Sequence, residues 1–277
     1  MAAWKLNPGM PARDGEMNAK VITIASGKGG VGKTTSVANI AVALASRGQK
    51  VTCIDGDIGL RNLDVILGLE NRIVYDLVDV VEGRCRLRQA MIRDKRLSEL
   101  YLIPAAQTRD KSAVSPSDMV RLCDELRSEV DWILIDSPAG IERGFKNAIA
   151  PADRVLVLTN PEVSAVRDAD RVIGLLEAEG KGPAALVINR LDMSMVRRGD
   201  MLSVEDVLDL LAIDLIGIVP EDDSVIVASN RGQPLALDGK NKAGLAFQNI
   251  ARRLMGEKVP FIDFDTPNVF QRLLGRK

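Results

Sequence analysis

A glycine-rich turn between an apolar run and a helical pattern constrains this chain more than any other feature. The run Val21–Ile24 is apolar and rich in β-branched residues, as in a buried strand, and helical periodicity begins near Lys33. The turn between them fits G-x-x-x-x-G-K-[ST] in the strand–loop–helix context that this motif requires, through Gly27, Gly32, Lys33 and Thr34. The stretch therefore predicts a loop that holds the phosphates of a nucleotide.

The chemistry of phosphate binding explains these residue types. Glycines let the loop wrap closely around an anion with its N–H groups pointing inward, and the following helix directs its positive end at the same anion. Lys33 is expected to reach the terminal phosphates, and the Thr34 hydroxyl to ligate Mg²⁺. A nucleoside triphosphate with Mg²⁺ is the predicted ligand of this loop. The predicted binding loop comprises Lys28, Gly29, Gly30, Val31, Gly32, Lys33, Thr34 and Thr35.

Carboxylates end two further predicted strands. Asp55 and Asp57 follow Val51–Ile54, and Asp136 ends Trp132–Asp136. Ligands bind outside the carboxyl ends of the strands in open α/β sheets. We therefore expect Asp57 beside the γ-phosphate, where it orients the attacking water, and both Asp55 and Asp136 near the metal with Thr34. The alternative for the first pair is a solvated turn.

The strand pattern predicts the fold class. Further strands are expected at Leu100–Pro104, Val155–Leu158, Ala185–Ile188 and Leu215–Val219, with helical patterns between them. This alternation predicts an α/β fold, a doubly wound and mostly parallel sheet with helices on both faces. The predicted domains are a disordered extension at 1–16, an ATPase domain at 17–256, a linker at 257–266 and an amphipathic helix at 267–277.

Composition excludes several function classes. The net charge is −1 and the basic residues are dispersed, so no nucleic-acid partner is expected. Histidine is absent, which excludes every mechanism that depends on it. The cysteines, Cys53, Cys85 and Cys123, are far apart and suggest neither a disulfide framework nor a zinc site. No apolar run approaches 18 residues, so no membrane span is predicted.

Two late strands are followed by polar groups. Asn189 and Arg190 come after one strand, and Pro220, Glu221 and Asp222 come after the next. At the carboxyl edge of the sheet these groups can frame a purine. Ordinary helix caps and turns remain the alternative from spacing alone.

The last eleven residues combine an apolar arc with positive charge. A helix would place Val269, Phe270, Leu273 and Leu274 within an arc of about 140°. Arg272, Arg276 and Lys277 supply the charge, and no acidic residue accompanies them. The pattern favours an interfacial membrane helix that binds an anionic surface. The alternative is a last helix docked on the parent domain.

The second lysine of the loop, Lys28, leads to a family resemblance. An ordinary phosphate loop does not need it, and a solvated loop lysine is the alternative to a charge supplied across a dimer interface. The pattern K-G-G-V-G-K-T-T resembles the deviant Walker A family of P-loop ATPases, and longer segments resemble its MinD members. These segments are 57–64, 104–111, 136–142, 159–170, 198–203 and 219–222.

The resemblance carries functional implications. It implies an ATPase of low intrinsic turnover that dimerises on ATP. Lys28, acting in trans, and Asp57 would be its catalytic residues. Asn189, Arg190 and residues 220–222 would contact the adenine. It further implies a switch that positions cell division: a cytoplasmic protein peripheral on the inner membrane face, which recruits a MinC-type inhibitor and is stimulated by a MinE-type partner. Three alternatives remain: a ParA-type partition ATPase, an iron–sulfur carrier, and a nucleotide-switched scaffold with negligible turnover.

Overall fold

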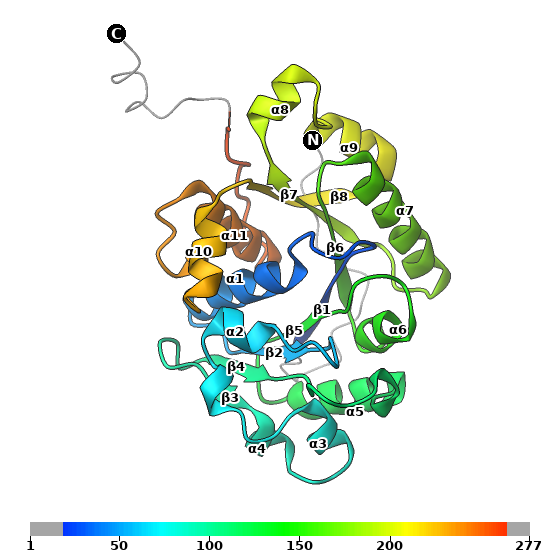
Figure 1. The fold of residues 1–277 in the computed structure, drawn as a ribbon, viewed down its shortest axis with the longest axis vertical. Helices are drawn as coiled ribbons and strands as arrows, with labels where there is room; N and C mark the ends of the chain where they lie inside the picture. Colours follow the sequence, from blue (N-terminus) through cyan, green and yellow to red (C-terminus); the bar gives the residue numbers. More distant parts are fainter. Residues whose placement is uncertain (1–18, 265–277) are drawn as a thin grey trace.

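Eight strands form one sheet at the centre of the computed structural model, which describes residues 19–264 (Figure 1). Their spatial order is β3-β4-β2-β5-β1-β6-β7-β8, and every pairing is parallel except that of β3 with β4. The strands are β1 Lys20–Ala25, β2 Val51–Asp55, β3 Ile92–Arg93, β4 Leu100–Ile103, β5 Trp132–Asp136, β6 Arg154–Thr159, β7 Ala185–Leu191 and β8 Asp214–Pro220.

Helices cover both faces of this sheet, which confirms the predicted fold class (Figure 1). The helices are α1 Lys33–Ala45, α2 Leu63–Leu67, α3 Leu77–Val81, α4 Leu87–Ala90, α5 Pro116–Leu126, α6 Arg143–Ile149, α7 Val163–Ala178, α8 Met193–Arg198, α9 Val204–Leu211, α10 Ser224–Asn230 and α11 Lys242–Leu254. Short 3-10 turns lie at Glu70–Arg72, Lys111–Ala113 and Leu235–Leu237.

The central strand β1 shows how the two layers form. Its side chains alternate between faces: Ile22 and Ile24 pack in a core with α1 and α11, whereas Val21 packs with α5. Ala25 belongs to a third cluster, with α6, α7 and α9. Because both faces of the sheet are covered, its strands are continuously apolar rather than alternating.

Most predicted elements appear with their ends shifted by one or two residues. A capping box begins α9, since the Ser203 hydroxyl accepts from the Asp206 N–H and the Asp206 side chain accepts from the Ser203 N–H. One expectation was wrong: Asn189 and Arg190 do not follow a strand but lie inside β7, beside an irregularity in its pairing with β8. The two-residue β3 was not predicted either, because it is too short to show a period.

The predicted segment 1–16 and tail 267–277 lie outside the described residues. Residues 257–264 of the predicted linker are described, and Ile262 among them packs against the core on the α1–α11 face. Within residues 19–264, no helix is long and apolar enough to cross a membrane.

Candidate functional site: a phosphate loop at the carboxyl edge of the sheet

The glycine-rich loop, residues 26–32, connects β1 to α1 at the carboxyl edge of the sheet. Gly30 and Gly32 have φ of 78° and 99°, backbone conformations that favour glycine. Gly27 is required for another reason: a Cβ there would lie 2.3 Å from the carbonyl oxygen of Asp168 on α7. The loop therefore packs directly on α7. Gly30 and Gly32 allow its curvature, and Gly27 allows its close approach to this helix.

Lys33 lies at the start of α1, with only 8% of its surface exposed. Its Nζ donates to the Ser26 hydroxyl at 2.8 Å, so the side chain folds back across the loop that precedes it. Burial lowers the pKa of Lys33, and the carboxylates of Asp136 and Asp57 oppose that shift. This ammonium group is held inside the loop, where a bound phosphate would sit.

Asp55 and Asp136 end neighbouring strands and face each other across the β2–β5 pairing. Asp55 is buried and accepts from the backbone N–H groups of Asp57, Asn62 and Leu63 at 3.0, 3.2 and 3.2 Å. Burial raises its pKa to about 6 despite these hydrogen bonds. Asp55 thereby fixes the turn that carries Asp57, and its oxygens are already engaged by backbone.

Asp136 offers the better metal site. The Thr34 hydroxyl donates to its carboxylate, and its Oδ1 is buried without a hydrogen-bond partner. Burial, and then the nearby charge of Asp55, raise the pKa of Asp136 well above its usual range. An orphaned buried carboxylate oxygen beside a threonine hydroxyl fits Mg²⁺. In residues 19–264 no cluster of three or more His, Cys, Asp or Glu could hold a metal, and Mg²⁺ in such sites takes further ligands from phosphate and water.

Lys28 is directed away from Lys33. Its Nζ lies 3.2 Å from Glu162 Oε2 and 3.3 Å from Ser164 Oγ, at the start of α7. The two charged side chains of this ion pair are 44% and 51% exposed. Thus one lysine of the loop is buried at the phosphate position and the other is accessible at the surface.

A small cavity of about 40 Å³ adjoins the loop. It brings together residues predicted to bind nucleotide: Gly32, Thr35, Asn189, Arg190, Pro220, Glu221 and Asp222. Val225, Ile226 and Phe247 complete its wall and were missed, because no local pattern distinguishes them from ordinary residues of α10 and α11. An ion pair of 3.8 Å joins Arg190 to Glu221 at its rim.

Asn189 has a contact that the sequence did not predict. It is buried, and its Nδ2 donates to the carbonyl oxygen of Val31 at 2.7 Å. A Cβ at Gly32 would lie 2.5 Å from the same Nδ2. The end of β7 is therefore locked to the phosphate loop by one buried hydrogen bond and close packing.

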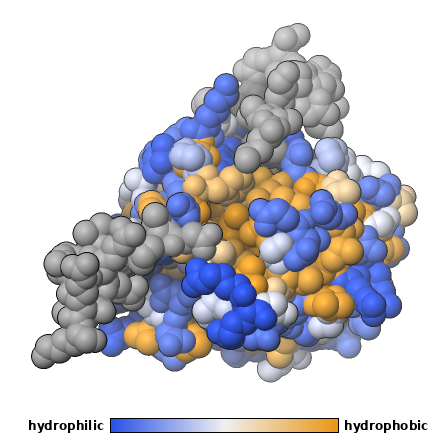
Figure 2. Space-filling model, turned by 90° about the horizontal axis from the view of Figure 1, so that it is seen from above, coloured by the Kyte–Doolittle hydropathy of each residue, from blue (hydrophilic) through white to orange (hydrophobic). Residues whose placement is uncertain are grey.

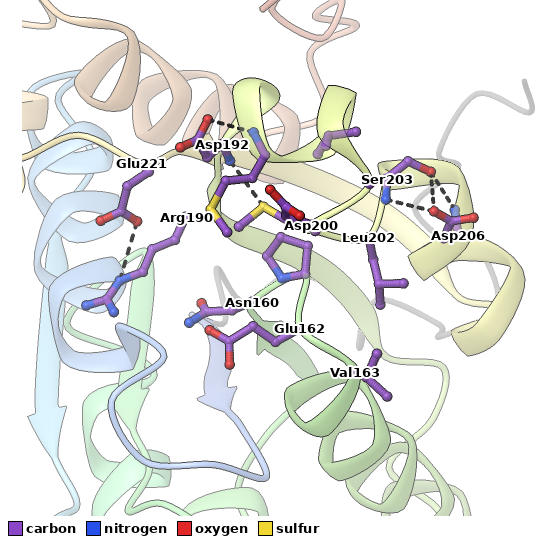
Figure 3. A pocket seen from close by; sticks show the side chains of 15 residues that line it. Asn160, Glu162, Val163, Arg190, Asp192, Asp200, Leu202, Ser203, Asp206 and Glu221 are labelled. Atoms are coloured by element: carbon purple, nitrogen blue, oxygen red, sulfur yellow. Dashed lines mark hydrogen bonds and ion pairs between the residues drawn. The ribbon is translucent and has the colours of Figure 1, made fainter.

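A hollow of about 690 Å³ continues outward from this rim (Figure 3). Arg190 and Glu221 border both spaces, and Glu162, the partner of Lys28, also lines the hollow. Figure 3 shows Asn160 and Glu162 on one side and Ser203 with Asp206 at the far end, near the start of α9. The nucleotide site therefore opens onto a wide surface depression beside Lys28.

Comparisons with known proteins agree with this geometry. A family model described as the CobQ/CobB/MinD/ParA nucleotide binding domain matches residues 22–235. The septum site-determining protein MinD of Bacillus subtilis is 56% identical over 243 residues, covering 87% of this chain and 91% of that protein. The chain belongs to the MinD family.

Solved structures support the assignment. MinD in the MinC:MinD cell division protein complex of Aquifex aeolicus is similar with a TM-score of 0.83 and 51% identity, covering 88% of this chain and 99% of that chain. MinD of Pyrococcus horikoshii, solved with Mg-ADP, has a TM-score of 0.77 and 29% identity, covering 85% and 96%. The family resemblance is confirmed, and the protein is a cell-division ATPase of the P-loop class.

Proposed function

We propose that the protein is an ATP-driven switch that positions the division site by cycling between a monomer and a membrane-bound dimer. The observation that carries this proposal is the contrast between its two loop lysines. Lys33 is buried beside Asp136, as a phosphate ligand should be, whereas Lys28 is exposed and contacts Glu162 and Ser164 at the start of α7. An exposed cation at the rim of a nucleotide site suits a second protomer's phosphates.

Nucleotide binding in the cycle uses the predicted loop. Backbone N–H groups of residues 28–35 and the Lys33 ammonium bind the phosphates, and the base lies against Asn189, Arg190 and residues 220–222. Mg²⁺, held through Thr34 and Asp136, would neutralise charge on the β- and γ-phosphates. Two loaded protomers then meet face to face, and Lys28 of each leaves Glu162 and reaches the other's phosphates.

Hydrolysis ends the dimeric state. Asp57 orients a water for in-line attack on the γ-phosphate, which gives ADP and inorganic phosphate. Asp55 acts as a positioning residue, because its carboxylate accepts the Asp57 N–H at 3.0 Å. Loss of the γ-phosphate removes the charge that attracted Lys28, so the dimer dissociates. Turnover is slow without a partner because the site is complete only after two surfaces have met.

Membrane attachment is proposed for the tail. Val269, Phe270, Leu273 and Leu274 would enter the interface of the cytoplasmic membrane face while Arg272, Arg276 and Lys277 contact anionic headgroups. One short amphipathic segment binds weakly, and two on one dimer bind together at high effective concentration. The dimer would recruit a MinC-type inhibitor and be stimulated by a MinE-type partner; the Aquifex relative named above was solved with MinC.

A ParA-type partition ATPase is the alternative function. It would share the loop and the fold, but it needs a basic surface that binds DNA. The near-neutral chain and the curated relative named for septum placement favour the division switch. Sedimentation with anionic vesicles or with duplex DNA separates the two: we expect ATP-dependent binding to vesicles and none to DNA.

Matched lysine variants test the switch. Lys33→Ala should abolish nucleotide binding, because it removes the buried charge at the phosphate position. Lys28→Ala should keep ATP binding within a few-fold and lose ATP-dependent dimers and stimulated hydrolysis. Equilibrium ATP titration followed by light scattering measures both properties. Normal ATP-dependent dimers of Lys28→Ala would refute the trans role.

A further inference from the structure

A second large hollow, of about 710 Å³, lies along β8 and shares no lining residue with the small cavity beside the phosphate loop. We call it the β8 groove. It is framed by α8, α9, β8 and the last described residues, 261–264. Its apolar lining includes Val204, Leu208, Leu215, Ile218, Phe261 and Phe264. Figure 2 shows apolar surface gathered on this end of the molecule.

The groove exists because β8 is the last strand of the sheet and has a neighbour on one side only. Leu215 and Ile218 on this strand are only half-buried. Val204 and Leu208 of α9 are also half-buried, although they pack against the core below. A concave apolar surface of this volume is in the size range of sites that take a ligand or peptide.

The chain itself forms one wall of the groove, and Arg253 holds that wall in place. Its guanidinium donates to the carbonyl oxygens of Ile216 on β8, Val259 and Pro260 at 3.0, 3.1 and 2.9 Å. It also lies 4.1 Å from the ring centre of Phe261. The root of the C-terminal segment is therefore fixed to the edge strand.

The charges of the groove and of the tail are complementary. Glu205, Asp214 and Asp263 are the charged residues that line the groove, and no basic residue of the described chain lines it. Residues 267–277 carry Arg272, Arg276 and Lys277 and no acid. Beside these charges the tail presents Val269, Phe270, Leu273 and Leu274, which match the apolar floor.

We propose that residues 267–277 of the same chain dock in the β8 groove when the protein is off the membrane. Val269 follows Phe264 by five residues, which span at most about 17 Å, so the tail reaches the groove without rearrangement. Its fixed root gives it a high effective concentration that a second copy or a separate protein lacks. If the tail is the membrane anchor proposed above, docking and membrane binding compete for the same apolar face.

Photo-crosslinking of the full-length protein tests the docking itself. A benzoyl-phenylalanine replaces Phe270, and a control carries it at Gln271 on the polar side of the arc. The protein is irradiated with Mg-ADP and without vesicles, and products are mapped by mass spectrometry. We expect intramolecular crosslinks from position 270 to α9 or β8, and several-fold fewer from position 271. Crosslinks elsewhere on the domain, crosslinks between protomers, or none would each overturn the proposal.

A matched pair of α9 variants supplies a second test. Leu208→Glu places a charge on the groove floor, whereas Leu210→Glu changes a leucine of the same helix that is 61% exposed and does not line the groove. An unpaired charge on the floor should weaken docking about tenfold or more. Thermal unfolding first checks that both variants fold. Equal crosslink yield in the two variants would contradict docking.

Because Leu208 contacts the core, an exposed variant provides an independent check. Glu205→Lys reverses one charge of the groove, and its crosslink yield should fall and then recover when Arg272→Glu is added. Asp209→Lys, exposed on the same helix but not lining the groove, should leave the yield unchanged. A Glu205→Lys yield equal to that of Asp209→Lys would contradict the charge complementarity on which docking rests.

Anionic vesicles separate this proposal from the membrane proposal. If the tail docks and also anchors, Leu208→Glu with ADP should bind phosphatidylglycerol vesicles several-fold better than Leu210→Glu. Groove crosslinks together with no vesicle binding in any state would refute membrane anchoring and leave docking intact. Vesicle binding without groove crosslinks would refute docking and leave the anchor intact.

Discussion

Asn189 gives the sharpest test of how the site works, because the sequence and the structure give it different roles. The sequence pattern predicts a contact with the purine. The structure shows its Nδ2 donating to the carbonyl oxygen of Val31, within the phosphate loop, at 2.7 Å. Asn189→Ala separates the two roles. Loss of a base contact would lower the affinity only for nucleotides whose base makes that contact, whereas loss of the loop contact would lower the affinity for every nucleotide.

The magnitude follows from burial. Val31 is 2% exposed and Asn189 is 7% exposed, so the variant leaves the Val31 carbonyl without this partner where water has little access. Loss of a buried hydrogen bond in this way costs about 1–3 kcal/mol. If that cost falls on the phosphate-holding conformation of the loop, nucleotide affinity falls roughly 5- to 150-fold. Asn189→Asp should be worse than alanine, because a carboxylate would face the carbonyl oxygen.

Calorimetric titration with Mg-ADP and Mg-IDP is the assay, because diphosphates avoid coupling to dimerisation and inosine lacks the exocyclic amine of adenine. A loop role predicts an equal loss for both ligands. Arg190→Ala is the control, since Arg190 borders the same small cavity whereas Asn189 donates the hydrogen bond to the Val31 carbonyl. Parental affinity of Asn189→Ala for IDP would refute the loop argument.

Three further predictions concern hydrolysis, the Lys28 pair and stability. Asp57→Ala should slow stimulated hydrolysis about 100-fold or more while ATP-dependent dimers live longer, as phosphate release and light scattering would show. Glu162→Gln removes an exposed ion pair worth about 0.2–1 kcal/mol from each protomer, so ATP-dependent dimers should form roughly 2- to 30-fold more tightly in sedimentation equilibrium. Arg96→Ala leaves the carboxylate of Asp94 buried without its 2.7 Å ion-pair partner and should cost about 3 kcal/mol in urea unfolding at neutral pH. Burial alone would raise the pKa of Asp94, but Arg96 and backbone hydrogen bonds hold this pKa below its usual range. The stability that the ion pair contributes is therefore complete above the pKa of Asp94 in the unfolded chain. It is lost as pH falls through the pKa of Asp94 in the folded protein.

Each of these predictions has an outcome that contradicts it. If Asp57→Ala hydrolyses ATP at the parental stimulated rate, a group other than Asp57 positions the attacking water. Unchanged or weaker dimers of Glu162→Gln would mean that the ion pair does not oppose assembly. The stability difference between the parent and Arg96→Ala should shrink as pH falls through the pKa of Asp94 in the unfolded chain and then through its lower pKa in the folded protein, as protonation neutralises this carboxylate. A difference independent of pH, or an equal loss in its exposed neighbour Lys95→Ala, would contradict the Arg96 argument.

Local patterns predicted the sheet and the phosphate loop because both arise from short-range rules. Buried parallel strands appear as continuous apolar runs, and a glycine loop before a helix has a fixed spacing. The sequence could not show that Glu162 pairs with Lys28, since 134 positions separate them and an exposed glutamate at a helix start is ordinary. Likewise, Val225 and Phe247 line the small cavity beside the loop only because of how α10 and α11 pack against the sheet.

The two loop lysines show why burial, rather than residue type, assigns function here. Five positions apart in one loop, both carry the same ammonium group. At Lys33 the protein surrounds the charge with carboxylates and the Ser26 hydroxyl, so an incoming phosphate meets a fixed, desolvated cation. At Lys28 the charge remains in solvent and is held by one exposed pair, so a competing anion can displace Glu162 at small cost. A buried cation suits permanent ligand binding and an exposed one suits exchange of partners. The switch proposed above needs both, and the loop places them at opposite ends of four glycine-rich positions.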